Sequence, residues 1–212
     1  IEQMPLEGHT VTIAGEIKDR DFNPEDYIEP KLTKRLDRYC QFAMVAADEA
    51  IADSGIDEAN IDPYRIGVIV SSAAGGFKTT EKSHTAMLEK GPTKCSPFTV
   101  PMLIVDMASG HISIKHGYKG INKVVVSACA TGSHSVGDAF RSIQYGDADV
   151  IVAGGCEATV TTLGIGAFTA ARTLSKRNDE PTKASRPYDK DRDGFVMGEG
   201  AGILILEEYE HA

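Results

Sequence analysis

Residues 124–134 read V-V-V-S-A-C-A-T-G-S-H, an apolar run that stops at Cys129 and continues through small residues. This order predicts a strand over 122–128, a tight turn at Cys129 and a helix from about 131 to 145. A strand–turn–helix elbow directs its middle side chain into a cleft. A helix N-terminus also favours the thiolate, the form in which a cysteine attacks. Cys129 is therefore a candidate nucleophile, although on composition alone a small buried cysteine is the commoner case.

The elbow lies in a chain that alternates short apolar strands with helices. A long amphipathic helix is predicted after Pro30, with Gly55 as its stop. Further strands are predicted at 10–17, 65–72, 149–155 and 201–208, and further helices at 102–116 and 163–174, before a polar loop at 175–194. This alternation predicts an α/β layered fold with a largely parallel, buried sheet. No repeat or linker divides the sequence, so residues 1–212 are predicted to form one domain.

Composition narrows the class of protein. The chain has 212 residues, of which 42% are hydrophobic, and a net charge of −9, which argues against general binding of nucleic acid. No apolar run approaches the ~18 residues of a membrane span, and no secretory signal is visible. The four cysteines form no CxxC pair, which favours a reducing, cytoplasmic setting. The chain begins at Ile1, so we expect the natural N-terminus to lie further upstream.

Two segments match ligand-binding motifs only in part. D-K-D-R-D-G at 189–194 matches the first half of a calcium loop, but the twelfth position is Gly200 where a Glu is needed. G-G-F-K-T-T at 75–80 has Phe77 where a phosphate loop needs Gly. Neither a metal nor another cofactor is predicted. His134 follows Cys129 too closely to lie over the thiol, so we expect a packed or surface histidine.

The wider sequence resembles the condensing enzymes of fatty-acid synthesis, the β-ketoacyl-acyl-carrier-protein synthases, and among them the synthase II group. The resemblance covers nearly the whole chain. It rests on S-P-F-T-V-P at 96–101, M-A-S-G-H at 107–111, S-A-C-A-T-G at 127–132, G-D-A-D-V-I-V-A-G-G at 146–155, S-K-R-N-D-E-P at 175–181 and A-S-R-P-Y-D-K-D-R-D-G-F-V-M-G-E-G-A-G at 184–202.

The resemblance implies a thiolase-like fold with two similar α/β halves, and a homodimer. It implies that an acyl chain passes from acyl carrier protein to the thiol of Cys129, where the Cys129 N–H serves as one arm of the oxyanion hole. Malonyl-carrier protein then loses carbon dioxide, and its carbanion attacks the thioester. The family's catalytic histidines, lysine and gate belong to a second half, and its opening strand is central to the first sheet. We therefore expect this chain to be a fragment that is inactive alone and poorly soluble or rearranged.

Two residues depart from the family in the acyl pocket. Ala74 stands where many relatives have Ile at the deep end, and Thr99 stands where a second Phe, which reaches towards the partner's pocket, is common. Phe168 matches the pocket wall. The smaller side chains predict longer acyl substrates, unless neighbouring residues compensate.

One basic segment interrupts the acidic chain. Lys31, Lys34, Arg35 and Arg38 against Asp37 give a local balance of 4 − 1 = +3. A solvated helix start is the ordinary explanation, yet cations at a helix N-terminus oppose its dipole. The resemblance implies instead that Lys31, Lys34 and Arg35, with Lys94 and Arg172 nearby, dock the acidic acyl carrier protein.

Three other functions share this fold. A non-catalytic chain-length partner of a ketosynthase lacks the nucleophile, and Cys129 argues against it. A polyketide ketosynthase stays open. A thiolase-like degradative enzyme is disfavoured by the basic segment and by the S-R-P-Y-D-K-D-R-D-G-F run.

Overall fold

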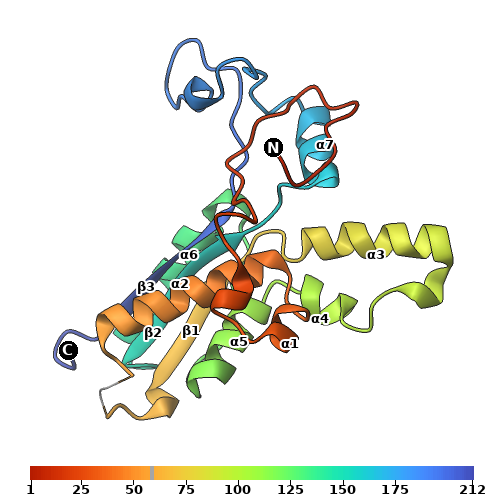
Figure 1. The fold of residues 1–212 in the computed structure, drawn as a ribbon. Coiled ribbons are helices and arrows are strands. Elements are labelled where there is room, and N and C mark those ends of the chain that lie inside the picture. The colour runs from red at the N-terminus through yellow and green to blue at the C-terminus, as the bar shows by residue number, and fades with distance from the viewer. Residues whose placement is uncertain (58–59) are drawn as a thin grey trace. The chain divides into compact units, whose positions relative to one another are not determined.

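The computed structural model describes residues 1–57 and 60–212 (Figure 1). The chain divides into two compact units, each built from two separate segments. Unit 1 contains Ile1–Asn23 and Ala158–Glu199. Unit 2, the larger, contains Pro24–Glu157 and Gly200–Ala212.

A three-stranded sheet forms the centre of unit 2, in the order β1 (Ile66–Ser71), β2 (Val150–Glu157) and β3 (Gly200–Glu207). Strands β1 and β2 are parallel, with Ile66 opposite Val150, whereas β3 runs antiparallel to β2. All three strands were predicted, within one or two residues at their ends. The hydrophobic runs of β1 and β2 are almost wholly buried, as expected for strands covered on both faces. The α/β class is confirmed.

Helices cover both faces of this sheet (Figure 1). Helix α6 (Thr131–Gln144) packs on the face that carries Ile151 and Ala153, where Ala139 joins a buried cluster with them. Helix α2 (Arg38–Ser54) covers the opposite face, beside α5 (Met107–His116) on β1. Because side chains alternate along a strand, Gly155 and Glu157 project to the α6 face.

The prediction of one continuous helix after Pro30 is wrong. It consists of α1 (Pro30–Thr33), four extended or turn residues, and α2, which begins only at Arg38. The Gln41 side chain donates to the carbonyls of Thr33 and Leu36 and so stabilises the break. The predicted stop is right, since Gly55 ends α2 with φ of 71°. Lys31 therefore lies in α1 and Arg38 begins α2, while Lys34 and Arg35 lie between the two helices, so the argument that four cations oppose one helix dipole is wrong.

Helix α3 (Phe77–Lys90) was not predicted from the sequence. Asp37, which is 3% exposed, accepts hydrogen bonds from the N–H of Thr79 at 2.9 Å and its hydroxyl at 2.5 Å. Burial raises the pKa of Asp37, while these bonds oppose the rise. Asp37 thereby satisfies an N-terminal donor of α3, which has no side-chain cap of its own.

The predicted helix at 102–116 is also divided. Helix α4 (Thr99–Leu103) ends before α5 begins at Met107, and the Tyr39 hydroxyl donates to the Ile104 carbonyl in the gap at 2.5 Å. Short 3₁₀ turns complete this unit at Pro24–Asp26, Pro63–Arg65, Pro92–Lys94 and Ala128–Ala130.

The strand predicted at 122–128 does not form. Asn122 makes a single parallel bridge to Val68, and no ladder continues towards Cys129 in the described residues. Side-chain hydroxyls take the place of strand partners: the Val125 N–H donates to Ser71 Oγ, and the Ser109 hydroxyl lies within hydrogen-bond distance of the carbonyls of Val68, Val70 and Lys123. The segment is extended against β1 without being a regular strand.

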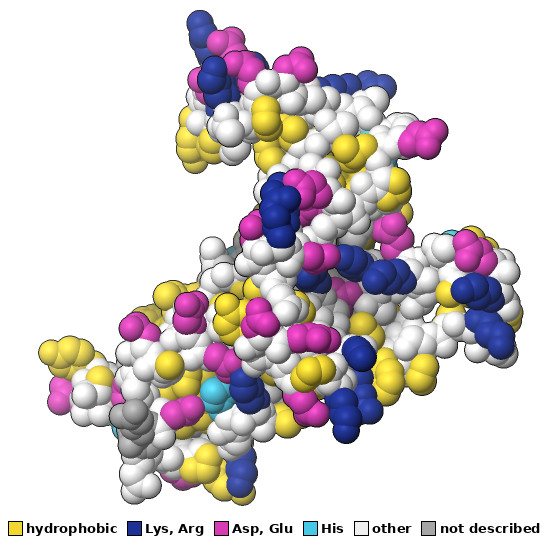
Figure 2. All heavy atoms as spheres, viewed as in Figure 1, with side chains coloured by type: hydrophobic (Ala, Val, Ile, Leu, Met, Phe, Trp, Pro, Cys, Tyr) yellow, Lys and Arg dark blue, Asp and Glu magenta, His cyan; other side chains and the backbone are white. Residues whose placement is uncertain are grey.

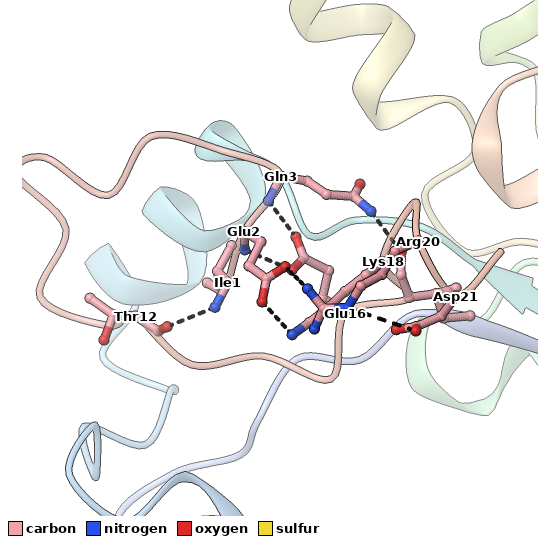
Figure 3. A network of polar contacts seen from close by, with 9 residues as sticks. Ile1, Glu2, Gln3, Thr12, Glu16, Lys18, Arg20 and Asp21 are labelled. Atoms are coloured by element: carbon pink, nitrogen blue, oxygen red, sulfur yellow. Dashed lines mark hydrogen bonds and ion pairs between the residues drawn. The ribbon is translucent and has the colours of Figure 1, made fainter. Parts of the chain in front are cut away.

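Unit 1 has little regular structure beyond α7 (Thr162–Ala170) and the 3₁₀ turn Pro181–Lys183. The strand predicted at 10–17 is reduced to one bridge, between Gly15 and Gly198. Its residues still supply the core, in a cluster of Val11, Ile13, Val160, Ile165, Leu174, Ala184 and Met197. The first residues are held by polar contacts (Figure 3): Glu16 accepts the N–H groups of Glu2 and Gln3 at 2.7 and 2.8 Å, and Glu2 pairs with Lys18 and Arg20.

No helix in the described part of the chain is long and apolar enough to cross a membrane. Within the same residues, no group of three or more His, Cys, Asp or Glu side chains is arranged to hold a metal ion. Asp193 of the half calcium motif accepts hydrogen bonds from the Ser175 hydroxyl and the Lys176 N–H.

Candidate active site

Cys129 lies in the middle of the 3₁₀ turn Ala128–Ala130, which leads directly into α6. Ala128 has φ of 51°, a left-handed conformation that costs a residue with a Cβ about 1–2 kcal/mol. The Ser127 N–H donates to Thr131 Oγ1 at 3.0 Å, which closes the turn. The Cys129 side chain is exposed, and its N–H meets no acceptor in the described part of the chain. The geometry is that of an elbow with an accessible thiol and a free backbone donor.

The first turn of α6 is seated on the ends of β1 and β2. Gly132 and Gly155 approach so closely that a Cβ built on Gly155 would lie 2.9 Å from the Cα of Gly132. The buried Ser135 hydroxyl donates to Ser71 Oγ at 2.8 Å, and Ser71 Oγ also accepts the Val125 N–H at 3.0 Å. Ser71 therefore joins β1 both to the helix that follows Cys129 and to the segment that precedes it.

The turn after β1 contains Ala74 and is held by hydrogen bonds to the Glu157 carboxylate. Glu157, the last residue of β2, accepts the N–H groups of Ala73 and Ala74 at 3.1 and 3.2 Å through one carboxylate oxygen. Its other oxygen accepts the Ser72 hydroxyl at 3.1 Å. The Ala74 methyl group is exposed. The predicted pocket residue thus projects from a turn whose backbone is tied to the sheet.

The other predicted pocket residues lie in different places. Thr99 is the first residue of α4, and its hydroxyl is 2.9 Å from that of Ser83 on α3. Phe168 belongs to unit 1, where it is 42% exposed and packs edge-to-face on Phe195 with ring centroids 5.4 Å apart. His134 is exposed on α6, which agrees with the expectation of a surface histidine.

Four of the predicted docking residues belong to unit 2. Lys31, Lys34, Arg35 and Lys94 are exposed, and Figure 2 shows dark-blue side chains gathered beside α1. The Arg35 guanidinium lies 4.8 Å from the centroid of the Phe98 ring, which brings the turn after α1 next to the segment that follows Lys94.

The fifth residue and the remaining members of the basic segment differ from this group. Arg172 is exposed in unit 1, with φ of 58°. Arg38 and Asp37 are both buried, so neither contributes to the surface counted from the sequence. The exposed charge of the segment is therefore the three cations Lys31, Lys34 and Arg35.

Sequence reasoning missed three residues that position the site. Ser71, Ser135 and Glu157 have no motif of their own, since each acts through a hydrogen bond to a segment far away in the chain. The only available signal for Glu157 was a charged residue at the end of an otherwise apolar strand, V-I-V-A-G-G-C-E.

Comparison with known proteins agrees with this arrangement. Residues 2–212 match the family described as "Beta-ketoacyl synthase, N-terminal domain". The chain is 48% identical over 212 residues to "3-oxoacyl-[acyl-carrier-protein] synthase 2" of Vibrio cholerae, covering all of this chain and 51% of that protein. The chain spans about half the length of the curated relatives it matches.

Two solved structures share the fold. One is a β-ketoacyl synthase from Burkholderia phymatum, with a TM-score of 0.82 and 31% identity over 97% of this chain and 50% of that one. The other is the ishigamide ketosynthase/chain length factor, with a TM-score of 0.86 and 30% identity over 100% of this chain and 51% of that one. The thiolase-like fold expected from the sequence is confirmed. The elbow, its sheet and these matches together show that the chain belongs to the β-ketoacyl synthase family and corresponds to its N-terminal domain.

Proposed function

We propose that this chain is the nucleophile-bearing half of a 3-oxoacyl-[acyl-carrier-protein] synthase of fatty-acid biosynthesis. The observation that carries the proposal is the exposed Cys129 in a strained elbow at the start of α6, in a chain of the ketosynthase family. The relatives named 3-oxoacyl-[acyl-carrier-protein] synthase 2 support this activity over the others that share the fold.

The first stage of the reaction is a transfer between two thioesters. The Cys129 thiolate attacks the acyl carbonyl carbon, and the carbonyl oxygen becomes an oxyanion that the Cys129 N–H can stabilise. The bond between the acyl carbon and the carrier's sulfur then breaks. The carrier leaves as a thiolate, which takes up a proton, and the acyl chain remains on Cys129 as a thioester.

The second stage, decarboxylative condensation with malonyl-carrier protein, is assigned to the complete synthase. The resemblance assigns the histidines and the lysine of that step to the second half of the family's chain. The half described here supplies the thioester that the carbanion attacks.

The acyl chain is proposed to contact Ala74 and Thr99 in unit 2, whereas Phe168, the third predicted pocket residue, belongs to unit 1. The small Ala74 and Thr99 side chains leave room for long acyl chains. An Ala74→Ile variant of the complete synthase should lose activity on long acyl chains and retain it on short ones. Identical chain-length profiles for variant and wild type would contradict this part of the proposal.

Acyl carrier protein is the proposed partner, docked on Lys31, Lys34, Arg35 and Lys94 of unit 2. Arg172, the fifth predicted docking residue, belongs to unit 1. Acidic carrier and basic surface attract each other, which raises the association rate at low ionic strength. The protein is further proposed to act as a homodimer in the cytoplasm.

A non-catalytic chain-length partner is the second candidate, because one similar structure is a ketosynthase/chain length factor. Alkylation separates the two. A cerulenin-type epoxide or iodoacetamide, followed by peptide mass spectrometry, should label Cys129 far faster than Cys95, while Cys40 and Cys156 are buried and serve as internal controls. Equal, slow labelling of Cys129 and Cys95 would favour the silent partner.

A further inference from the structure

We propose that Glu157 is a positioning residue that holds the 72–75 turn and thereby sets which acyl chain lengths Cys129 accepts. This inference rests on the proposed function, because it takes Ala74 as the end of the acyl pocket. It assigns a role to a residue that contributes no motif and carries no chemistry of its own.

The Glu157 carboxylate fixes the backbone of the turn through three hydrogen bonds. Glu157 Oε2 accepts both the Ala73 N–H at 3.1 Å and the Ala74 N–H at 3.2 Å, and Oε1 accepts the Ser72 hydroxyl at 3.1 Å. Ser72 Oγ in turn accepts the Gly75 N–H at 2.7 Å. Every residue from 72 to 75 therefore has a hydrogen bond to Glu157 or to the Ser72 hydroxyl that Glu157 holds. Bonds to an ionised acceptor are about twice as strong as neutral ones, so the charge itself matters.

The far side of the turn is confined by close packing. A Cβ built on Gly75 would lie 2.4 Å from the Leu103 carbonyl oxygen, and one on Gly76 would lie 2.2 Å from that of Met102. The Gly76 N–H also donates to the Leu103 carbonyl at 3.1 Å. The turn thus lies between the Glu157 carboxylate, which accepts the Ala74 N–H, and the C-terminal end of α4, which Gly75 and Gly76 approach closely.

The same strand also contacts the helix that follows the nucleophile. Gly155, two residues before Glu157 and on the same face of β2, forms the close contact with Gly132 at the start of α6. One end of β2 therefore positions both the elbow that presents Cys129 and the turn that presents Ala74. A change in the Glu157 carboxylate moves the turn without touching the contact that seats the elbow.

The variant Glu157→Gln tests this assignment in the complete synthase. It keeps the side-chain shape, removes the charge and replaces one acceptor by a donor. The exposed Glu49 on α2 provides a matched control, Glu49→Gln, which removes a carboxylate from the same unit outside the site. Ser72→Ala, alone and combined with Glu157→Gln, measures whether the two residues act as one unit.

Two readouts are needed. Hydrogen exchange of the peptide around residues 70–77 reports on the turn, and the amides of Ala73 and Ala74 should exchange about 10-fold faster in Glu157→Gln, as expected for the loss of about 1.4 kcal/mol. The ratio of Cys129 acylation rates from hexadecanoyl- and octanoyl-carrier protein reports on selectivity. We expect Glu157→Gln to change this ratio by about 5-fold or more, in line with pocket discrimination by apolar contacts, and Glu49→Gln to leave it unchanged. Glu157→Asp should restore part of both effects.

The outcomes separate this inference from the proposed function. If wild-type Cys129 accepts no acyl group from either carrier, the proposed function is wrong, and the selectivity role of Glu157 fails with it. If the wild type is acylated while Glu157→Gln has the wild-type chain-length ratio, the function stands and this inference is overturned. Unchanged exchange at residues 70–77 in Glu157→Gln overturns the structural part whatever the acylation result. A uniformly slower acylation with an unchanged ratio indicates a purely structural role and also overturns the inference.

Discussion

Ala128 precedes Cys129 in the elbow and has a strained backbone conformation. Its φ of 51° belongs to the left-handed region, which glycine adopts readily and other residues do not. Backbone strain of this kind persists where the surrounding structure holds the residue in place, as the closed turn of Ser127 and Thr131 does here. The elbow is therefore a local conformation imposed by its neighbours.

The pair Ala128→Gly and Ala130→Gly tests this strain. Ala130 has φ of −91° and gains nothing from glycine, so its replacement should lower the free energy of unfolding by about 0.5–1 kcal/mol. Ala128→Gly relieves the left-handed cost and should leave stability unchanged or raise it by up to about 1 kcal/mol. Urea unfolding of both variants measures the difference. Equal destabilisation by the two substitutions would contradict a strained Ala128.

Single residues were predictable where the chemistry is local. The exposed Cys129, the left-handed stop at Gly55 and the surface basic residues all follow from motifs or short-range rules. The role of Glu157 was not predictable, because the groups that donate hydrogen bonds to its carboxylate lie 83 to 85 residues away in the chain. The burial of Arg38 was missed for a similar reason, since a guanidinium over the Phe42 ring cannot be read from a count of charges.

The contact between α6 and β2 depends on two glycines. A Cβ on Gly155 would meet the Cα of Gly132 at 2.9 Å and its nitrogen at 3.4 Å, which only a shift of the helix can relieve. Because Cys129 directly precedes α6, such a shift moves the nucleophile as well. The close contact between α6 and β2 therefore fixes the position of Cys129.

Gly155→Ala should therefore destabilise the protein by about 1–3 kcal/mol, the usual cost of overpacking, and slow the acylation of Cys129. Gly137 on the same helix has no atom within 4 Å of its added Cβ. Gly137→Ala should be neutral or stabilising by up to about 1 kcal/mol, because alanine favours a helix over glycine. Thermal unfolding and acylation rates compare the two. A Gly155→Ala protein with wild-type stability would show that the glycine contact is not needed.

Helices α2 and α5 are joined by a histidine between two carboxylates. His116, the last residue of α5, has its Nε2 3.0 Å from Asp48 and its Nδ1 3.0 Å from Asp57, with its side chain 11% exposed. Tyr118 stacks on the imidazole and donates to Asp57, while Lys115 also pairs with Asp48. The hydrogen bond to Asp48, opposed by burial and aided by Asp57, raises the pKa of His116. Burial raises the pKa of Asp48, but the hydrogen bonds from His116 and Lys115 outweigh this effect, so that the pKa of Asp48 is lowered.

These shifts give a definite dependence of stability on pH. The His116 contribution is fully present below its ordinary pKa of 6.5 and is lost as pH rises through the raised value in the folded state. The Asp48 contribution is present above 3.8 and is lost as pH falls through its lowered folded value. The contact therefore stabilises most between these limits. A helix C-terminus adds to the preference for a cationic imidazole.

His116→Gln should lower the free energy of unfolding by about 1–2 kcal/mol at pH 6 and by much less at pH 9. His84→Gln on α3, where the histidine is exposed, is the matched control and should have little effect at either pH. Chemical unfolding across this range measures both. A His116→Gln effect that is the same at pH 6 and pH 9 would rule out the charged form as the source.

Elements with strong apolar periodicity were predictable, and those that depend on side-chain hydrogen bonds were not. Strands β1 and β2 were found because each contains an unbroken apolar run that is buried, and the buried residues of α6 recur at three- and four-residue steps. Helix α3 was missed because Thr79 is its only fully buried residue, so no apolar stripe marks it. The expected strand at 122–128 fails because Ser71 and Ser109 hydroxyls take the bonds that a ladder would use.

The chain passes between its two units three times, at Asn23–Pro24, Glu157–Ala158 and Glu199–Gly200. The second and third crossings have no linker composition, since they lie in runs of mostly small and apolar residues, C-E-A-T-V and G-E-G-A-G. Composition could not reveal this division, because it depends on which segments pack together. The N-terminal segment joins the core of unit 1 through Val11 and Ile13, which lie within the strand predicted at 10–17, although no strand forms there.

The chain has a net charge of −9, which repels an acidic partner. The proposed docking of acyl carrier protein therefore depends on the local basic surface of Lys31, Lys34, Arg35 and Lys94. Lys34→Glu in the complete synthase should raise the KM for acyl carrier protein about 5-fold or more at low salt, with the difference shrinking as ionic strength rises. Lys119, which is exposed over the Tyr64 ring and is not one of the predicted docking residues, provides the control Lys119→Glu, which makes the same charge change. Equal effects of the two variants would assign the change to net charge and not to docking.

The central claim is that Cys129 accepts an acyl group from a carrier protein. The direct measurement is the mass of the Cys129 peptide after incubation of the complete synthase with hexadecanoyl-carrier protein and no malonyl substrate. The account predicts one added acyl group, bound as a hydroxylamine-sensitive thioester on Cys129, and none in a Cys129→Ala variant. Acylation at Cys95 instead, or no acylation in a folded protein, would contradict it.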